Sequence, residues 1–277
     1  MRTFKPEGNY SINRNTVMED VVKAFKLNEP ITGLVLGFDK EEKTLEVYLG
    51  EKVRAKMPWK ESTLYDFTYK KRKEEDIPDQ VLMLFHKRIR AKITSINKDG
   101  TIILSRRANM IEAWDFISCN FDNYVYNARI INKTEVGVFF DIADGLIAFC
   151  HVKDFSPIAV RLMDWAKIGE VYDVVLVERY ETELKQGPYR LRCSKKKASK
   201  TDIKNIYHNM IVDVKIGDEV RDGNSDGIKG FWAEITPNIA GIANINAKAV
   251  LPKYGDTVEA IVTRISGEKK HIHLDII

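Results

Sequence analysis

Three short segments in the middle of the chain place an aromatic ring and several cations on one face of predicted strands. In GVFFDI (137–142), side chains alternate across the strand, so Phe140 and Ile142 turn inward while Phe139 and Asp141 turn outward. In NARII (127–131) and YRLRCSK (189–195), the same alternation turns Ala128, Ile130, Leu191 and Cys193 inward and Asn127, Arg129, Arg190, Arg192 and Ser194 outward. Such a face suits single-stranded nucleic acid, because bases stack on a ring for roughly 1 to 3 kcal/mol each and cations meet the phosphates.

Further candidate contacts lie outside these segments. The strand RIRAKI (88–93) predicts an outward stripe of Arg88, Arg90 and Lys92, and Lys195 follows the last middle strand. Later in the chain, Trp232 offers a second ring, with Lys229 close before it. The alternative interpretation is that Phe139 packs beneath the 151–165 connection and that the arginines only keep the surface soluble.

Motifs of the common enzyme classes are missing from the sequence. It contains no GxSxG nucleophile turn, no phosphate-binding Walker loop, no GxGxxG and no HExxH. His271 and His273 alternate to one side of a strand, but no third histidine or cysteine has a spacing suited to a metal site. We therefore expect no catalysis, no metal and no cofactor.

Composition and charge place the chain among soluble globular proteins. It has 277 residues, 44% of them hydrophobic, with 44 Lys and Arg against 40 Asp and Glu. The basic surplus lies in the first two thirds, while residues 213–277 have eight basic and ten acidic residues. The sequence has neither an apolar stretch long enough for a membrane span nor a signal-peptide core, so we expect a cytoplasmic protein without a membrane partner. The three cysteines are widely separated and form no CxxC, which argues against a disulfide framework.

Two stretches have helical periodicity. Residues 16–27 space apolar residues three to four apart, with Thr16 as the predicted N-cap, Glu19 completing a capping box and Pro30 ending the helix. Residues 107–119 predict a second helix with an apolar stripe of Ile111, Trp114, Phe116 and Ile117.

The remaining sequence predicts strands, and their order repeats three times. The first copy has strands at 31–37, 44–49, 88–96 and 101–105, with an Asn97–Gly100 hairpin turn joining the last two. Similar series begin near residues 125 and 217, so each repeat is roughly 65 to 80 residues long. A sheet of about five short strands can remove its edges by closing into a small barrel of the OB type.

The middle repeat carries four consecutive sequence signatures. They are Gly137, Phe139, Asp141 and Ile142; Gly145-Leu146-Ile147; Gly169 with Val171 and Val175; and Arg190-Leu191-Arg192-Cys193-Ser194-Lys195. Together they resemble the RNA-binding repeat of small-subunit ribosomal protein S-one. RAKMPWKE (54–61) and IILSRR (102–107) resemble parts of the same repeat, and AEITPNIAGIA (233–243) is similar to the shortened closing repeat of the compact, few-repeat proteins of this family in Gram-positive bacteria.

This resemblance implies an all-β-dominated chain of three tandem five-stranded OB-fold barrels joined by short helices, with the third barrel degenerate. The predicted divisions are an N-terminal helical segment (1–29), the first repeat (30–108), a helical linker (109–122), the second repeat (123–198), a linker (199–212) and the third repeat (213–277).

The sequence also departs from the family at its stacking positions. Many repeats have an aromatic residue and a histidine where this middle repeat has Val136 and Ala148, which leaves Phe139 as its one predicted ring. In the first repeat, Glu46 stands at the ring position, and a carboxylate repels phosphates. The third repeat keeps Trp232. We therefore expect weak contacts that add up across tethered repeats.

The resemblance implies a non-catalytic, translation-associated protein that binds single-stranded RNA and contacts mRNA or the ribosome. By the same resemblance, the first repeat would dock to a protein or to the ribosome. The alternative is a protein–protein interaction module of the same fold in which RNA binding is weak or lost. Salt separates the two interpretations, because affinity carried by phosphate contacts falls steeply between about 50 and 200 mM salt. The RNA sequence and the oligomeric state stay open.

Overall fold

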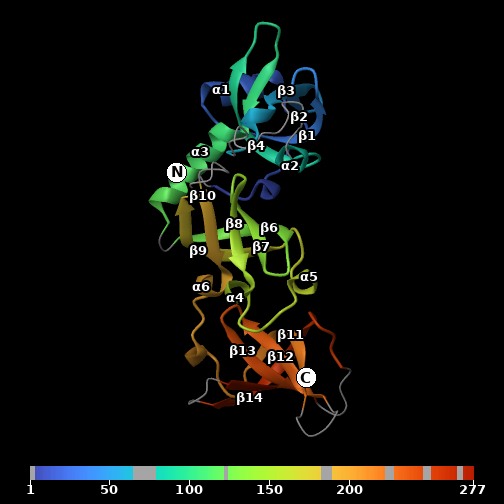
Figure 1. Ribbon diagram of the computed structural model, residues 1–277, viewed down its shortest axis with the longest axis vertical. Coiled ribbons are helices and arrows are strands. Elements are labelled where there is room, and N and C mark those ends of the chain that lie inside the picture. Colours follow the sequence, from blue (N-terminus) through green and yellow to red (C-terminus); the bar gives the residue numbers. More distant parts are fainter. Residues whose placement is uncertain are drawn as a thin grey trace. The chain divides into compact units, whose positions relative to one another are not determined.

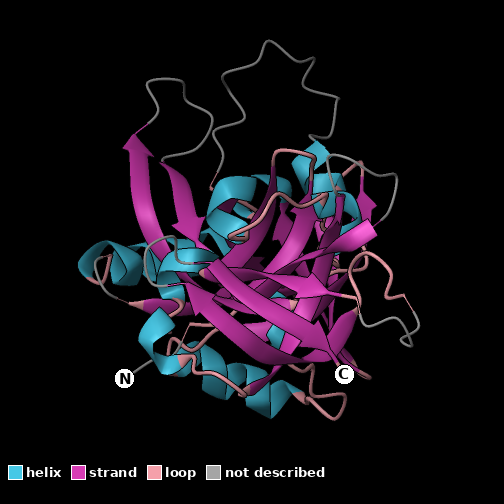
Figure 2. Cartoon of the chain, turned by 90° about the horizontal axis from the view of Figure 1, so that it is seen from below, coloured by secondary structure: helices cyan, strands magenta, loops and turns pink. Residues whose placement is uncertain are grey.

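Strands make up most of the structure and form three closed barrels (Figure 1; Figure 2). The computed structural model describes residues 4–64, 79–121, 124–181, 189–221, 228–245, 251–266 and 271–277. In each barrel the first three strands are consecutive neighbours, and the fifth strand lies between the third and the fourth. The predicted fold class, three tandem five-stranded OB-fold barrels, is confirmed.

The first barrel closes in the order β1-β2-β3-β5-β4. Its strands are β1 Ile31–Asp39, β2 Thr44–Gly50, β3 Val53–Pro58, β4 Arg88–Ile96 and β5 Ile102–Ser105. Strands β3 and β5 are parallel, whereas the other pairs are antiparallel. Alternation along β2 fills the core with Leu45, Val47 and Leu49, which are fully buried. The predicted hairpin turn joins β4 to β5, with Gly100 at φ +86°, a conformation that favours glycine.

The second barrel closes in the order β10-β8-β7-β6-β9. Its strands are β6 Val125–Lys133, β7 Gly137–Ala143, β8 Leu146–His151, β9 Val171–Glu181 and β10 Tyr189–Ser194. All six residues predicted to turn inward are buried: Ala128, Ile130, Phe140, Ile142, Leu191 and Cys193. Strand alternation therefore predicted the core of this barrel correctly.

The third barrel closes in the order β11-β12-β13-β15-β14, and all five strands are present. They are β11 Ile211–Arg221, β12 Ile228–Thr236, β13 Ile239–Asn244, β14 Thr257–Ser266 and β15 His271–Ile276. Its core is made of aliphatic side chains around Phe231. Strand β15 pairs with both β13 and β14, so it lies inside the closed sheet.

Helical segments are short and lie between the strands. They are η1 Glu7–Asn9, α1 Met18–Lys26, η2 Trp59–Glu61, α2 Asp79–Leu82, α3 Arg106–Cys119, α4 Val152–Phe155, α5 Leu162–Trp165, α6 Lys195–Ala198 and η4 Ile203–Asn205. None of the helices in the described ranges is long and apolar enough to span a membrane.

Helix α1 has its N-cap at Val17, one residue later than the sequence predicts. The Thr16 hydroxyl donates to the carbonyl of Asn13 at 2.7 Å, so it does not cap the helix. Asp20, rather than Glu19, accepts a hydrogen bond from the backbone N–H of Val17 at 3.1 Å and fixes the first turn.

Helix α3 starts at a true cap, because the Ser105 hydroxyl oxygen accepts from the backbone N–H of Ala108 at 2.8 Å. Its predicted apolar stripe is only partly right. Ile117 is fully buried, but Ile111 is 46% exposed. The face that packs inward also carries polar residues, Arg106 and Asn109.

By internal packing, the chain divides into two compact units. The first unit joins residues 1–129, 141–148 and 178–191, and the second joins residues 130–140, 149–177 and 192–277. The repeat boundaries predicted from the sequence stay a prediction.

Residues 4–10, which we call the N-terminal strap, are fastened within the first unit by a buried ion cluster. Both carboxylate oxygens of Glu7 accept from Arg106, through Nε and Nη2, at 2.8 Å each. The backbone N–H of Glu7 donates to Asp141 at 2.7 Å, and the backbone N–H of Asp144 donates to the carbonyl of Lys5 at 2.8 Å. The strap therefore ties helix α3 to the turn between β7 and β8.

Asp141 is buried in this cluster, so the prediction that it turns outward is wrong. Its carboxylate accepts from the backbone N–H groups of Glu7 and Gly145, which bind it on the side that strand alternation assigned to solvent. Burial raises the pKa of Asp141 to about 8, and the nearby Glu7 carboxylate adds to the rise.

Candidate nucleic-acid interface

Three aromatic side chains lie side by side on the outward surface of the second barrel. Phe139 on β7 has its ring centroid 5.1 Å from that of Phe149 on β8, with the planes tilted by 51°. Phe149 lies 6.4 Å from His151 at the end of β8, in an edge-to-face arrangement. All three side chains are half-buried. We call this set the aromatic row.

The aromatic row is larger than the sequence predicted. Ala148 stands at the position of the family's stacking histidine, but its side chain is fully buried. The comparison with the family therefore assigned the outward face of β8 to a position one residue away from the residues that form it. The outward positions of β8 are residues 147, 149 and 151, and Phe149 and His151 occupy two of them. Applying strand alternation to LIAFCH (146–151) could have found both rings.

Local geometry holds two members of the row in place. A Cβ atom on Gly137 would lie 2.3 Å from the Cζ atom of Phe149, so glycine at this position makes room for the ring. His151 caps helix α4, because its Nδ1 atom accepts from the backbone N–H of Lys153 at 3.2 Å. Rings fixed in this way lose little conformational entropy when a base stacks on them.

The cations near the end of β10 have different environments. Arg192 is partly exposed and donates to the Asp154 carboxylate at 3.1 Å. Arg190 lies in β10, but its side chain is outside the described residues. Ser194 is fully buried, contrary to prediction, because its hydroxyl oxygen caps α6 by accepting from the backbone N–H of Lys197 at 3.1 Å.

Lys195, which the sequence offers as a phosphate contact after the last middle strand, is buried within the second unit. Its ammonium group lies 3.0 Å from a carboxylate oxygen of Glu234 and over the rings of Phe155 and Tyr172, at 4.5 and 4.6 Å from their centroids. Lys195 is the first residue of helix α6, which follows β10 directly. The other carboxylate oxygen of Glu234 accepts from Ser156 at 2.6 Å.

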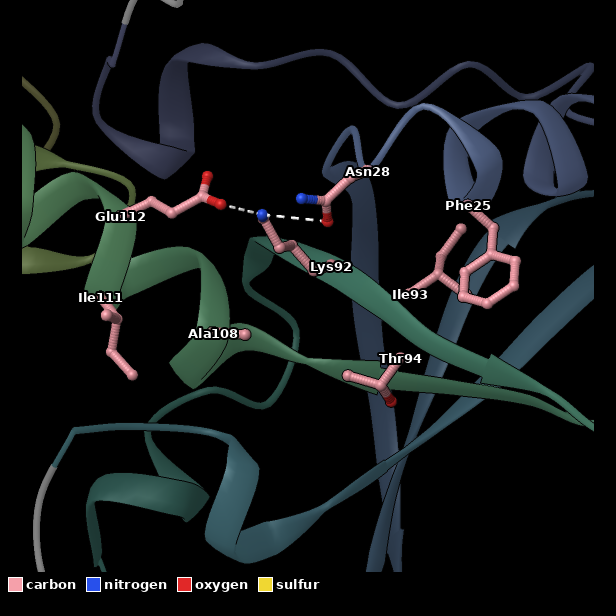
Figure 3. A pocket seen from close by; sticks show the side chains of 8 residues that line it. All are labelled: Phe25, Asn28, Lys92, Ile93, Thr94, Ala108, Ile111 and Glu112. Carbon is pink, nitrogen blue, oxygen red and sulfur yellow. Dashed lines mark hydrogen bonds and ion pairs between the residues drawn. The ribbon is translucent and has the colours of Figure 1, made fainter.

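The predicted basic stripe of the first barrel is largely engaged by the chain itself. Arg88 donates to the carbonyl of Tyr10 at 3.0 Å, and the Arg90 guanidinium lies 4.0 Å from the centroid of the Tyr10 ring. Lys92 is buried between Glu112 and Asn28, so the prediction that it turns outward is wrong (Figure 3). The N-terminal strap and helix α3 cover strand β4, which strand alternation cannot reveal.

The ion pair of Lys92 lies beside a shallow hollow between α1, β4 and α3 (Figure 3). The hollow has a volume of about 540 Å³, and Phe25, Ile93 and Ile111 form most of its apolar lining. It contains no row of rings comparable to that of the second barrel.

The remaining predicted contacts are divided between the units. In the first unit, Arg129 donates to the side-chain oxygen of Asn9 at 3.0 Å, and Asn127 is exposed. In the second unit, Trp232 on β12 is 39% exposed, and Lys229 is exposed on the same strand. Within the described ranges, no three His, Cys, Asp or Glu side chains are grouped so as to hold a metal ion.

No protein-family model and no curated protein matches this chain. Among solved structures, it is similar to a multidomain protein with nucleic-acid-binding domains from Streptococcus pneumoniae, at 11% identity and a TM-score of 0.30, over 90% of this chain and 73% of that one. It is also similar to a Drosophila chain described as Unr CSD456, at 11% identity and a TM-score of 0.20, over 89% of this chain and 94% of that one. At these TM-scores neither likeness bears on function, and the resemblance to ribosomal protein S-one stays a prediction.

Proposed function

We propose that this chain is a non-catalytic protein that binds single-stranded RNA through the aromatic row of its second barrel. The observation that carries the proposal is the contact between Phe139, Phe149 and His151 on the outward face, while other residues fill the core. Half-exposed rings in mutual contact can accept successive bases, because every base has a flat π-face.

Cations of the second unit supply phosphate contacts in this proposal. Lys153 and Lys197 are exposed, and Arg192 lies on β10, the strand next to β8. Three phosphate contacts on a single strand give a slope of about −2 for log affinity against log salt concentration. Affinity should therefore fall about 20-fold between about 50 and 200 mM salt.

The biological setting is the part of the proposal that rests on the family resemblance alone. If the family resemblance holds, the RNA is mRNA or ribosomal RNA, the process is translation, and the protein works in the cytoplasm. The first barrel then contacts the ribosome or another protein.

The test is fluorescence anisotropy of labelled oligouridine titrated with the full chain at about 50 and 200 mM salt. Phe139→Leu and Phe149→Leu keep apolar bulk but remove the flat ring. Each should raise Kd about 5- to 150-fold, the equivalent of roughly 1 to 3 kcal/mol of stacking per base. Tyr207→Leu is the matched control, because Tyr207 is a 64% exposed aromatic residue outside the row.

A folded Phe149→Leu protein with the affinity of the unsubstituted chain would remove the aromatic row from the binding site. Circular dichroism and the melting temperature establish that each variant is folded. An equal loss of affinity in Tyr207→Leu would also contradict the proposal, because it would show that any exposed ring contributes.

A second candidate function, protein docking by the first barrel, is favoured by exposed apolar residues on and just after α1. Met18, Phe25 and Leu27 are 38%, 41% and 56% exposed, while the cations of β4 are engaged internally. Cosedimentation with ribosomes at about 200 mM salt tests it. Phe25→Ser with Leu27→Ser should abolish cosedimentation if the first barrel docks to the ribosome, whereas Phe149→Leu should leave it intact.

A further inference from the structure

Four side chains form a continuous row across four neighbouring strands of the third barrel. Trp232 on β12 is paired with Ile242 on β13, Ile242 with His273 on β15, and His273 with Arg264 on β14. Trp232, Ile242 and His273 each lie next to a buried core residue of the same strand, namely Ala233, Ala243 and Leu274, and Arg264 is exposed. The four side chains therefore lie on the outward face, and we call them the third-barrel row.

Two members of the third-barrel row offer flat rings. Neighbouring strands are about 4.8 Å apart, so Trp232 and His273, which are two strands apart, are separated by about 10 Å. Ile242 lies between them as an apolar spacer and is half-buried. This arrangement suits two bases of one strand, one on each ring.

A β-bulge brings Arg264 into the row. The register of β14 against β15 shifts between Val262 and Arg264, so Thr263 and Arg264 both lie opposite His273. In a regular strand Val262 and Arg264 would share one face, because they are two residues apart. Val262 is fully buried in the core, so Arg264 would then turn inward as well. Bulges re-aim side chains in this way at functional sites, and here the bulge places an exposed cation beside a ring.

A carboxylate marks one side of the row. Asp275 lies two residues after His273 on β15, and its Oδ1 atom accepts from Asn244 Nδ2 at 3.0 Å. Because a carboxylate repels phosphates, the sugar–phosphate backbone should pass on the side away from Asp275.

We infer that the third barrel is a second binding site for single-stranded RNA, with one base on Trp232, one on His273 and a phosphate at Arg264. The inference rests on the proposed function for the class of ligand, but it uses none of the residues of the aromatic row. Two modest sites in one chain reinforce each other on a longer strand, because the second contact becomes intramolecular.

The experiment measures the anisotropy of a labelled twelve-nucleotide oligouridine at about 50 mM salt with full-length variants. Trp232→Leu and His273→Leu should each raise Kd about 5-fold or more. Arg264→Gln should raise Kd and reduce the slope against log salt by about 0.7, whereas Arg221→Gln, another exposed arginine of this barrel, should change neither. Asp275→Asn should lower Kd. Ultraviolet crosslinking of the unsubstituted chain should map uridine to Trp232 or His273, whether or not every variant folds.

The outcomes separate this inference from the proposed function. If Phe149→Leu weakens binding while Trp232→Leu and His273→Leu do not, and no crosslink maps to the third barrel, the inference is overturned and the proposed function stands. If only the third-barrel variants weaken binding, the inference stands and the aromatic row is not the site. If the unsubstituted chain does not bind at about 50 μM, both are overturned.

Discussion

Arg106 is the only cation bonded to Glu7 among the described residues, and replacing it tests what holds the first unit together. Its side chain and that of Glu7 are each 8% exposed. Besides bonding to Glu7, the guanidinium donates to the backbone carbonyl of Ser62 at 2.7 Å, and it interacts electrostatically with the carboxyl groups of Asp141 and Asp144. Arg106→Met keeps the apolar stem but removes the charge and all of its donors.

We expect Arg106→Met to lower the free energy of unfolding of the first unit by about 3 to 5 kcal/mol, because it leaves the Glu7 carboxylate buried without its counter-charge. Domain stabilities are about 5 to 15 kcal/mol, so a loss of this size is large. Adding Glu7→Gln should recover part of it, since the double variant buries no unpaired Glu7 charge. Urea unfolding followed by tryptophan fluorescence measures both effects, because Trp59 and Trp114 lie in the first unit.

The matched control is Arg54→Met. Arg54 also pairs with a glutamate, Glu46, but its side chain is 64% exposed, so we expect a loss of at most about 1 kcal/mol. Equal losses in Arg54→Met and Arg106→Met would refute the reasoning. A double variant no more stable than Arg106→Met alone would show that the cost does not come from the unpaired carboxylate.

Two further predictions follow from buried titratable groups. The pKa of Asp141 is about 8 in the folded chain and near 3.8 when unfolded, so the stability that its protonated form contributes to folding is fully present below about pH 4 and is lost as the pH rises to about 8. The urea midpoint should therefore fall over this range, and Asp141→Asn should make the fall less steep. An equally steep fall in the variant would contradict the shift. Cys150 and Cys193 are fully buried, and burial raises the pKa of Cys193, so a maleimide should label only the exposed Cys119 in the native chain and all three thiols in urea. Rapid native labelling of a second thiol would disprove this.

Periodicity predicted the three barrels because closed sheets impose strict alternation on their strands. Phe140, Ile142 and Leu191 are buried where alternation places them. The same rule, applied to β8, was enough to find Phe149, which comparison with a family pattern had missed. Much of the candidate site was therefore readable from local sequence.

The errors arose where distant segments cover a strand. Lys92 alternates outward in sequence and Lys195 follows the last strand of its barrel, but their partners Glu112 and Glu234 are 20 and 39 residues away. Asp141 is bound by the backbone of Glu7, 134 residues earlier in the chain. The bulge that turns Arg264 outward could not be predicted from the sequence either, because one extra residue in a strand leaves the amino-acid composition of that strand almost unchanged. Such features depend on tertiary contacts and so lie beyond a reading of local patterns.

The N-terminal strap also constrains the order in which this chain can fold during synthesis. Glu7 cannot bond to Asp141 until the ribosome has added the 134 residues that end with Asp141. At about 5 to 20 residues per second, this takes about 7 to 27 s, far longer than small domains usually need to fold. The strands of the first barrel are complete by Ser105, so they can close while Glu7 still lacks its Asp141 partner. Completion of the strap's contacts is therefore a late, non-local step, and slower translation between residues 105 and 145 would prolong the interval in which the backbone N–H of Glu7 lacks its Asp141 partner.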